Sequence, residues 1–490
     1  MKLETIAIAI RPSTVNGSLD ADIRGIAYDS RQVRSGYLFV AMPGERSDGN
    51  LFVDDALKRG AAAIVSDKPR PHSGSATFLQ VPDSRRAAAE VARVFHGDPA
   101  SKMQVAGITG TNGKTTTAFM MRDILAAAGR APGLIGTVEY RIGGRVIPAS
   151  RTTPEAMDLQ AMMDQMTQVG CRSCVMEVSS HALAQSRVWD IDFDVGVFTN
   201  LTHDHLDYHI DMERYFEAKK QLFVWMARSR KDPAAVINAD DPWGRRLAAI
   251  WDLRARLITY GCDPAASVRA AGLEIGPKGS VFTLVSPWGE VRVSLSLLGR
   301  FNVSNALAAA AACGSLGVDM RLIADVLSRV NSIPGRLEVI PNRRGFHVFV
   351  DYAHTDDAMG NVLRALREIT AGRLIIVFGC GGNRDKKKRP KMGAVAAELA
   401  DYSILTSDNP RKENPSEIIE QVRSGFGDRG CFEVVEDRAE AIRRGIGMAG
   451  KGDVLLIAGK GHEPFQEFAN TIVPFDDREI ARKILGEAGS

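Results

Sequence analysis

A glycine-rich loop between an apolar strand and a helix constrains the fold of this chain more than any other feature. We expect the strand at Met103–Thr109, the loop at Gly110–Gly113 and the helix at Thr115–Ala128. Glycines allow the backbone to turn tightly and to direct several N–H groups at one anion, and the helix N-terminus adds its positive end. The loop therefore predicts a site for nucleotide phosphates, with Lys114 at the outer phosphates and the hydroxyl of Thr115 on magnesium.

The spacing of this loop departs from the standard phosphate loop, because Ile108 stands five positions before Gly113, where that pattern has glycine. The alternative interpretation is an ordinary turn between a strand and a helix. Such a turn seldom needs two glycines, a lysine and two threonines in close succession. Because the strand, loop and helix also follow in the order that the motif requires, nucleotide binding is the favoured interpretation.

Length and hydrophobic patterning predict the domain organisation. At 490 residues the chain is too long for one compact domain, and its 45% hydrophobic residues allow each domain its own core. Apolar strands alternate with helices, which is typical of a parallel α/β sheet. We expect three α/β domains: a small N-terminal one at 1–98, a central phosphate-loop ATPase domain with a parallel sheet at 99–333, and a Rossmann-like C-terminal one at 334–490. Turn-forming residues at Phe95–Pro99 and Asn331–Arg336 mark the boundaries.

Charge, cysteines and hydropathy argue against several classes of protein. A formal net charge of +3 is too small for a protein that coats nucleic acid. Only two of the six cysteines, Cys171 and Cys174, are close together, so we expect reduced thiols and no zinc site. We find no run of about 18 apolar residues and no signal-peptide pattern. We therefore expect a cytoplasmic protein without a membrane span or a nucleic-acid partner.

Acidic residues and histidines follow two later strands. Glu177 lies near the end of the apolar strand Ser173–Val178, and the segment Asn200–His209 follows the strand Val195–Thr199 with three histidines and two aspartates. A buried carboxylate is costly unless it is paired or bound to a cation, and ligands of parallel sheets bind beyond the carboxyl ends of the strands. We therefore expect a magnesium site here. The alternatives are an exposed glutamate on an edge strand and a simple polar loop.

In this order the motifs resemble those of the Mur ligases of peptidoglycan synthesis, through essentially the whole chain. The family's Thr-Gly-Thr-Asn-Gly-Lys-Thr loop stands here as Thr109–Thr115, which accounts for the unusual spacing. The segment Tyr215–Lys219 matches the one in which the family carries a carbamylated lysine, an anion that can ligate or orient magnesium. The resemblance implies that the metal site and the catalytic residues come from Lys114, Thr115, Glu177, His205 and the modified Lys219.

The resemblance also implies two nucleotide sites. The expected ATP contacts are Gly110, Thr111, Asn112, Gly113, Lys114, Thr115, Thr116, Asn302, Arg336 and Asp351. The expected contacts of a UDP-linked substrate are Tyr28, Ser30, Glu45, Arg46, Ser47, Thr152, Thr153, Ser179, Gln185 and Arg187. Arg187 suits an acidic substrate, because a guanidinium group binds carboxylate or phosphate in two places at once. The family pattern leads us to expect asparagine at position 151, where Arg151 stands, and implies no role for it.

An amino-acid site is implied for the C-terminal domain. In the family, Asp-Asn-Pro-Arg marks the members that add meso-diaminopimelate rather than lysine, and it stands here as Asp408, Asn409, Pro410 and Arg411. A planar arginine can bind the second carboxylate of diaminopimelate bidentately, and an unpaired Arg411 would repel the ammonium of lysine. Arg384, Gly459 and Glu463 match the other family positions around this amino acid, with Glu463 expected to pair with its far ammonium.

The implied activity is that of an ATP-dependent, ADP-forming ligase of cell wall biogenesis, with consequences for cell shape and cell division. ATP would phosphorylate the D-glutamate γ-carboxylate of UDP-N-acetylmuramoyl-L-alanyl-D-glutamate, and the amine of meso-2,6-diaminopimelate would then displace phosphate. We expect a monomer whose third domain closes over the nucleotide. The alternatives are a lysine-adding relative, a folylpolyglutamate synthetase-like ligase and a phosphate-loop ATPase without ligase activity.

Overall fold

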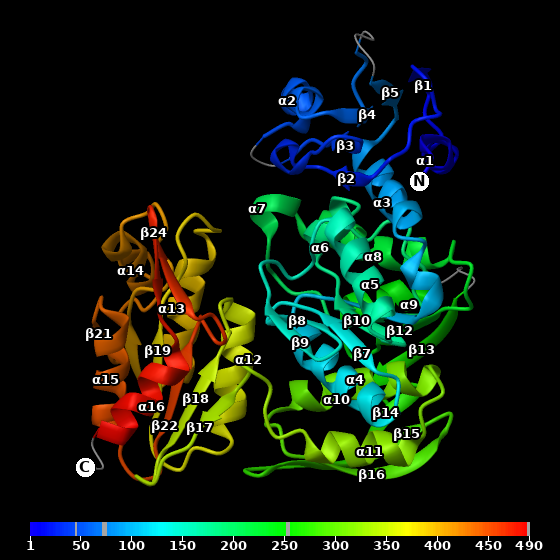
Figure 1. The fold of residues 1–490 in the computed structure, drawn as a ribbon. Coiled ribbons are helices and arrows are strands. Elements are labelled where there is room, and N and C mark those ends of the chain that lie inside the picture. The colour runs from blue at the N-terminus through cyan, green and yellow to red at the C-terminus, as the bar shows by residue number, and fades with distance from the viewer. Residues whose placement is uncertain (45–46, 71–75, 251–254, 488–490) are drawn as a thin grey trace.

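The computed structural model describes residues 1–44, 47–70, 76–250 and 255–487. Figure 1 shows three α/β bodies: an N-terminal one in blue, a central one from cyan to green, and a C-terminal one from yellow to red. The N-terminal body lies against one end of the central body, and the C-terminal body lies beside it. Mainly parallel sheets with helices on both faces confirm the predicted α/β class.

The N-terminal body is built on a mixed sheet. Its strands, in sheet order, are β1 (Thr14–Asn16), β5 (Thr77–Gln80), β4 (Ala61–Ser66), β3 (Tyr37–Ala41) and β2 (Gly25–Ala27). Helices α1 (Leu3–Ile10) and α3 (Ser84–Phe95) cover one face, and α2 (Val53–Lys58) covers the other. Helix α3 also packs on α5 (Ala156–Gln168) of the central body, and Met157 of α5 is buried in the N-terminal core. This contact joins the first two bodies.

The central sheet is parallel in its middle and antiparallel at both ends. Its strands, in sheet order, are β16 (Gly289–Leu295), β15 (Gly279–Ser286), β14 (Val268–Gly276), β13 (Arg256–Gly261), β12 (Ala234–Asn238), β11 (Val195–Phe198), β6 (Gln104–Thr109), β10 (Ser173–Glu177), β7 (Pro132–Ile135), β8 (Glu139–Ile142) and β9 (Arg145–Pro148). The predicted strands at 173–178 and 195–199 are found to within one residue. Glu177 pairs in register with Ile108, and Phe198 with Thr109. The phosphate loop, Glu177 and the segment after β11 therefore leave the sheet at the same edge.

Helices cover both faces of the central sheet. On one face α4 (Lys114–Ala127), α10 (Arg300–Ser315) and α11 (Met320–Arg329) pack together. The alanines at 308–312 of α10 are all buried, and their small side chains allow the helix to approach α4 and the sheet closely. On the other face lie α5, α6 (Ser180–Ala184), α8 (Met212–Met226) and α9 (Pro242–Ala249), with the short α7 (Leu206–His209) beside them.

The C-terminal body has helices on both faces of a second, smaller sheet. Its strands, in sheet order, are β17 (Glu338–Ile340), β18 (His347–Asp351), β22 (Val454–Ala458), β19 (Leu374–Phe378), β20 (Tyr402–Leu405) and β21 (Phe432–Val434). One face carries α12 (Asp356–Arg367), α13 (Lys388–Leu399) and α14 (Pro415–Arg423), and the other carries α15 (Arg438–Met448) and α16 (Asp477–Glu487). A hairpin of β23 (Phe465–Phe468) and β24 (Thr471–Pro474) follows β22. Across the described ranges, no helix has the length and apolar character needed to cross a membrane.

Candidate active site

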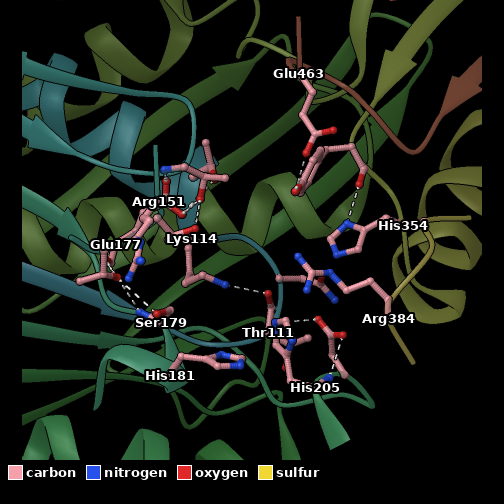
Figure 2. A pocket seen from close by; sticks show the side chains of 18 of the residues that line it. Thr111, Lys114, Arg151, Glu177, Ser179, His181, His205, His354, Arg384 and Glu463 are labelled. Atoms are coloured by element: carbon pink, nitrogen blue, oxygen red, sulfur yellow. Dashed lines mark hydrogen bonds and ion pairs between the residues drawn. The ribbon is translucent and has the colours of Figure 1, made fainter. Parts of the chain in front are cut away.

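A cavity of about 1630 Å³ lies where the three bodies meet (Figure 2). The residues predicted from sequence that line it are Tyr28, Ser30, Ser47, Thr111, Asn112, Gly113, Lys114, Thr115, Thr116, Thr152, Thr153, Glu177, Ser179, Gln185, Arg187, His205, Asn302, Arg336, Asp351, Arg384, Asp408, Asn409, Arg411, Gly459 and Glu463. Gly110 and Pro410 adjoin lining residues in the chain, and Lys219 contacts Gly110. Glu45 and Arg46 lie outside the described residues. One cavity thus brings together side chains from positions 28 to 463.

The phosphate loop joins β6 to α4 with the geometry that its glycines predict. Gly113 immediately precedes α4 and has a φ of +87°, a conformation that favours glycine, and a side chain there would collide with Asn305. The Nζ of Lys114 donates hydrogen bonds to the carbonyl oxygens of Gly110 at 2.8 Å and of Thr111 at 2.9 Å. Burial lowers the pKa of Lys114. The N–H groups of Thr111 and Asn112 donate to Asn200, each at 2.9 Å, so the anion site of this loop is formed by the N-terminus of α4 with the side chain of Lys114.

Glu177 is a buried carboxylate held by neutral hydrogen-bond donors. Its side chain accepts from the hydroxyl of Thr115 at 3.0 Å, and from the backbone N–H and the hydroxyl of Thr137 at 2.8 and 2.9 Å. Only 1% of Glu177 is exposed. Among the residues that the structure describes, no lysine, arginine or histidine forms an ion pair with it. Its burial excludes the alternative of an exposed glutamate on an edge strand. A buried carboxylate in this setting suits a cation.

The oxygen donors at this point fit magnesium. The carboxylate of Glu177 and the hydroxyl of Thr115 are hard oxygen ligands, and they adjoin the loop that would hold phosphates. Within the described ranges, no group of three or more histidine, cysteine, aspartate or glutamate residues is arranged to hold a metal. Mg²⁺ is usually held by one or two carboxylates together with water and substrate phosphates.

Lys219 and His205 approach the same loop from the segment after β11. Only 1% of Lys219 is exposed, and its Nζ donates to the carbonyl oxygen of Gly110 at 2.8 Å. Burial and the nearby Lys114 lower the pKa of Lys219 well below its ordinary value, which favours the neutral amine. His205 immediately precedes α7, and its Nε2 lies 3.4 Å from Oδ2 of Asp204. A neutral amine is the form of lysine that can react with carbon dioxide, so Lys219 is suited to carbamylation.

The C-terminal body contacts the phosphate loop directly. Nη2 of Arg336 donates to the hydroxyl of Thr115 at 3.2 Å, and Nδ2 of Asn112 donates to Oδ2 of Asp357 at 2.8 Å. The carboxylate of Asp351 accepts from two backbone N–H groups, so it also fixes the turn that follows Arg336. The third body is therefore already docked on the loop in this conformation.

Arginines surround one glutamate in the part of the cavity next to the N-terminal body. Arg187 donates to the carbonyl oxygen of Thr153 at 2.9 Å, and its Nη2 lies 3.0 Å from the carboxylate of Glu155. Arg151, for which the sequence implied no role, forms an ion pair with the same carboxylate at 2.6 Å. Arg85 of α3 lies 3.6 Å from it. Asp158 also lies close enough to act on Glu155 and Arg151, so three arginines face two acidic residues here. Arginines gathered in this way suit an acidic substrate.

The Asp408–Arg411 segment lies on the opposite side of the cavity. Nε of Arg411 donates to Oε2 of Glu467 in β23 at 2.7 Å, and Nη1 donates to the carbonyl oxygen of Gly382 at 2.9 Å. The expectation that Arg411 is unpaired is therefore wrong, because β23 supplies a carboxylate from a distant part of the sequence. Nδ2 of Asn409 donates to Oε2 of Glu463 at 2.9 Å. An arginine and a carboxylate thus face one cavity, as a zwitterionic amino acid requires.

Thr137 and Asp357 are two of the cavity-lining residues that were not singled out from the sequence. Thr137 follows β7, the neighbour of β10, so the rule that ligands lie beyond the carboxyl ends of parallel strands could have identified it once the strand order was known. Asp357 lies in the first turn of α12, and no motif marks it. Its contact with Asn112 depends on the docking of two bodies, which no local pattern predicts.

Comparison with known proteins agrees with this geometry. Residues 108–313 match the Mur ligase middle domain, residues 335–461 match the glutamate ligase domain of Mur ligases, and residues 22–104 match the Mur ligase family catalytic domain. These matches cover most of the chain, and each falls on one of the three bodies. The phosphate loop and Glu177 lie in the first match, and Arg411 lies in the second.

Relatives at higher identity span the whole chain. UDP-N-acetylmuramoyl-L-alanyl-D-glutamate–2,6-diaminopimelate ligase of Geobacter metallireducens is 47% identical, covering 100% of this chain and 99% of the relative. The enzyme of the same description from Caldanaerobacter subterraneus is 45% identical, covering 97% of each. A solved structure of such a ligase has a TM-score of 0.71 and 32% identity, covering 100% of this chain and 99% of that chain. The chain belongs to the Mur ligase family.

Proposed function

We propose that this protein is an ATP-dependent ligase that adds meso-2,6-diaminopimelate to UDP-N-acetylmuramoyl-L-alanyl-D-glutamate. The observation that carries the proposal is the shared cavity, because the phosphate loop, the arginines around Glu155 and the Arg411 segment all face it. Relatives at 43–47% identity over nearly the full length carry that activity in their names. Nucleotide-linked precursors of this kind are made in the cytoplasm, where we place the reaction.

The first step transfers the γ-phosphoryl group of ATP to the D-glutamate γ-carboxylate and forms an acyl phosphate. We assign the phosphate contacts to the backbone N–H groups at the N-terminus of α4 and to Lys114, which must turn from its carbonyl partners toward the anion. Thr115 and Glu177 would hold magnesium, with His205 and carbamylated Lys219 nearby. Magnesium would neutralise charge on the phosphoryl oxygens. The acidic substrate would be held by Arg187.

The second step joins the amine to the activated carboxyl group. The amine nitrogen attacks the carbonyl carbon, a tetrahedral intermediate forms, and phosphate leaves with the electron pair of the broken C–O bond. The attacking nitrogen gives up one proton, to water or to the departing phosphate, and the neutral amide remains. We assign Arg411 to the carboxylate at the far end of diaminopimelate and Glu463 to its ammonium. Holding both reactants in one cavity converts an encounter of two molecules into a reaction within one complex, which accounts for much of the expected rate.

A phosphate-release assay tests this proposal. Purified protein, ATP, magnesium and the UDP-linked dipeptide are mixed with either meso-diaminopimelate or L-lysine, and inorganic phosphate is followed over time. We expect release with diaminopimelate at least tenfold faster than with lysine, the discrimination that one charged hydrogen-bonded contact provides. Release with lysine alone would refute the specificity, and equal release without any amine would favour an ATPase that makes no amide bond.

A further inference from the structure

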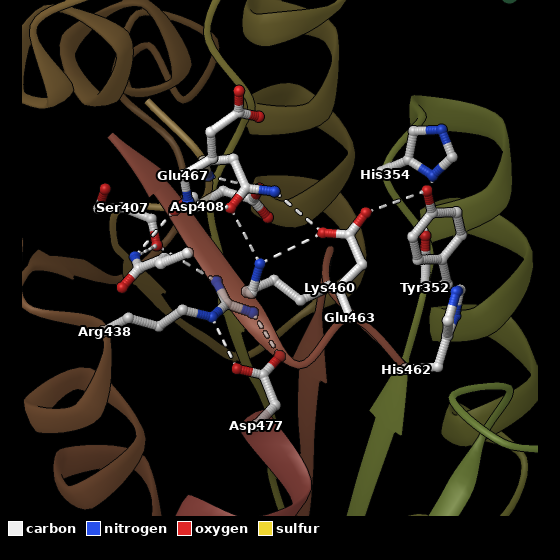
Figure 3. Close-up of polar contacts among 12 residues, drawn as sticks. Tyr352, His354, Ser407, Asp408, Arg438, Lys460, His462, Glu463, Glu467 and Asp477 are labelled. Carbon is white, nitrogen blue, oxygen red and sulfur yellow. Dashed lines mark hydrogen bonds and ion pairs between the residues drawn. The ribbon is translucent and has the colours of Figure 1, made fainter. Parts of the chain in front are cut away.

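A buried lysine lies beneath the amino-acid part of the cavity. The side chain of Lys460, in the loop after β22, has 0% of its surface exposed, and Lys460 does not line the cavity. Its two polar partners, Asn409 and Glu463, do line the cavity. Figure 3 shows the lysine ammonium directed at Glu463. Lys460 therefore contacts the cavity through these two side chains.

The contacts of Lys460 form a closed triangle. Its Nζ donates to Oδ1 of Asn409 at 3.1 Å and to Oε2 of Glu463 at 3.2 Å, while Nδ2 of Asn409 donates to the same Oε2 at 2.9 Å. Because an ammonium group only donates, it requires the carbonyl oxygen of the amide to face it. The amide N–H₂ of Asn409 must then face Glu463. The backbone N–H of Glu467 also donates to Oδ1 of Asn409 at 3.0 Å, and the hydroxyl of Tyr352 donates to Oε1 of Glu463 at 3.4 Å. The triangle therefore acts together with these two contacts to orient both lining side chains, and Lys460 supplies its only charged donor among the described residues.

Lys460 is also the cation that compensates Glu463. Two nearby carboxylates have arginine partners instead, with Arg411 on Glu467 and Arg438 on Asp477, each at 2.7 Å. Burial raises the pKa of Glu463, and the charge and hydrogen bond of Lys460 act against that rise. Loss of the lysine would favour protonation of the carboxyl group. A protonated carboxyl group is a poorer acceptor for a substrate ammonium.

We propose that Lys460 is a positioning residue that holds Asn409 and Glu463 in the orientation that receives the ammonium of the incoming amino acid. The proposal rests on the proposed function, because it needs an amino acid in this part of the cavity. Lys460 itself touches no substrate. Its effect is exerted on the affinity for the amino acid and not on the transfer of phosphate, since the phosphate loop belongs to another body.

Steady-state kinetics of Lys460→Met test this assignment. We expect the KM for meso-diaminopimelate to rise about tenfold or more, as for loss of a hydrogen bond to a charged group. The KM values for ATP and for the UDP-linked dipeptide should stay within about twofold of wild type, and kcat at saturating amine should change little. As a control, Lys231→Met removes a lysine–carboxylate pair that lies outside the cavity. In that pair Nζ of Lys231 lies 2.6 Å from the carboxylate of Asp194. The control should leave all three KM values unchanged.

The pH dependence separates positioning from a general structural effect. The groups that face Glu463 are Lys460, Asn409, Asp408, Tyr352 and Arg438. If the lysine keeps Glu463 ionised, the ratio of the variant KM to the wild-type KM should fall as pH rises, because the carboxylate re-forms above its raised pKa. Because both proteins use the same amine substrate, the effect of its own titration on KM cancels in this ratio. A structural effect alone predicts a ratio that does not vary with pH.

Two further results define the outcome. Lys460→Gln keeps an N–H donor without the charge, and it replaces the methionine variant if that variant does not fold. For Lys460→Gln too, we expect the ratio of the variant KM to the wild-type KM to fall as pH rises. An unchanged or lower KM for meso-diaminopimelate, or a ratio that is flat with pH, would overturn the role of Lys460 while wild-type turnover still upholds the proposed function. Wild-type protein without amine-dependent phosphate release would overturn both.

Discussion

Replacing Arg438 with methionine perturbs a fully buried ion pair of the C-terminal body. Nε and Nη2 of Arg438 donate to the two carboxylate oxygens of Asp477 at 2.8 and 2.7 Å, and Nη2 also donates to the carbonyl oxygen of Ala458 at 2.9 Å (Figure 3). Neither side chain of the pair is exposed. The substitution leaves the Asp477 carboxylate buried without its cation, so we expect the free energy of unfolding to fall by about 3–5 kcal/mol.

Thermal unfolding followed by circular dichroism or calorimetry measures this loss. For a cooperative unit of roughly 150–250 residues, each kcal/mol lowers Tm by about 2–4 °C, so the transition of the C-terminal body should fall by about 6–20 °C. Urea unfolding of the same variant gives the free energy independently. The N-terminal and central bodies should unfold as in wild type if their transitions are resolved.

Two control variants isolate the cause. Arg423→Met removes an exposed pair with Glu420, whose side chains are 50% and 62% exposed, and should lower the stability far less than loss of the buried pair, because water screens the exposed charges. The double variant Arg438→Met/Asp477→Leu removes both buried charges and should recover much of the lost stability. An Arg438→Met variant that loses no more than Arg423→Met would refute the reasoning, because burial of the pair would then have no energetic consequence.

Three other predictions follow from the structure. In bicarbonate, intact-mass or peptide mass spectrometry should find one added carboxyl group on Lys219. Lys219→Ala should abolish phosphate release, and added bicarbonate should not restore it. An unmodified lysine that can be replaced without loss of activity would contradict this prediction. Arg411→Ala should raise the KM for meso-diaminopimelate by roughly 10–100-fold and leave the KM for ATP unchanged; an equal change for ATP would indicate misfolding instead. Hydrogen bonding to Arg389 lowers the pKa of Glu413 from 4.5 to about 2, so its contribution to stability is present above pH 4.5 and is lost as pH falls toward 2. The difference in unfolding free energy between wild type and Arg389→Met should therefore shrink over that range, and a constant difference would exclude the pair as its source.

Local features were the most predictable from the sequence. The strand, loop and helix around Gly113 follow from chain-local signals: an apolar run, glycines and a helix start. The burial of Glu177 could also be predicted, because an apolar strand next to the phosphate loop leaves its last side chain at the same edge of the sheet. The first inference depends only on residues that are close in the sequence, whereas the second also depends on the pairing of β10 with β6.

Contacts between distant segments were not predictable in the same way. Arg411 was expected without a partner, yet Glu467 in β23 reaches it from more than fifty positions away. The antiparallel strands at both ends of the central sheet were not predicted, because their alternating, half-exposed side chains give a weak signal. Lys460 shows no pattern at all in the sequence. Its importance follows only from its full burial between two cavity-lining side chains.

The most direct test of the proposed reaction is identification of its product. The protein is incubated with ATP, magnesium, UDP-N-acetylmuramoyl-L-alanyl-D-glutamate and equal amounts of meso-diaminopimelate and L-lysine, and the nucleotide products are separated and weighed by mass spectrometry. We predict one new UDP-linked tripeptide, with the mass of the dipeptide joined to diaminopimelate through an amide bond, formed in equal amount to ADP and phosphate. A lysine-containing product in excess, or ADP without any tripeptide, would contradict the proposed function.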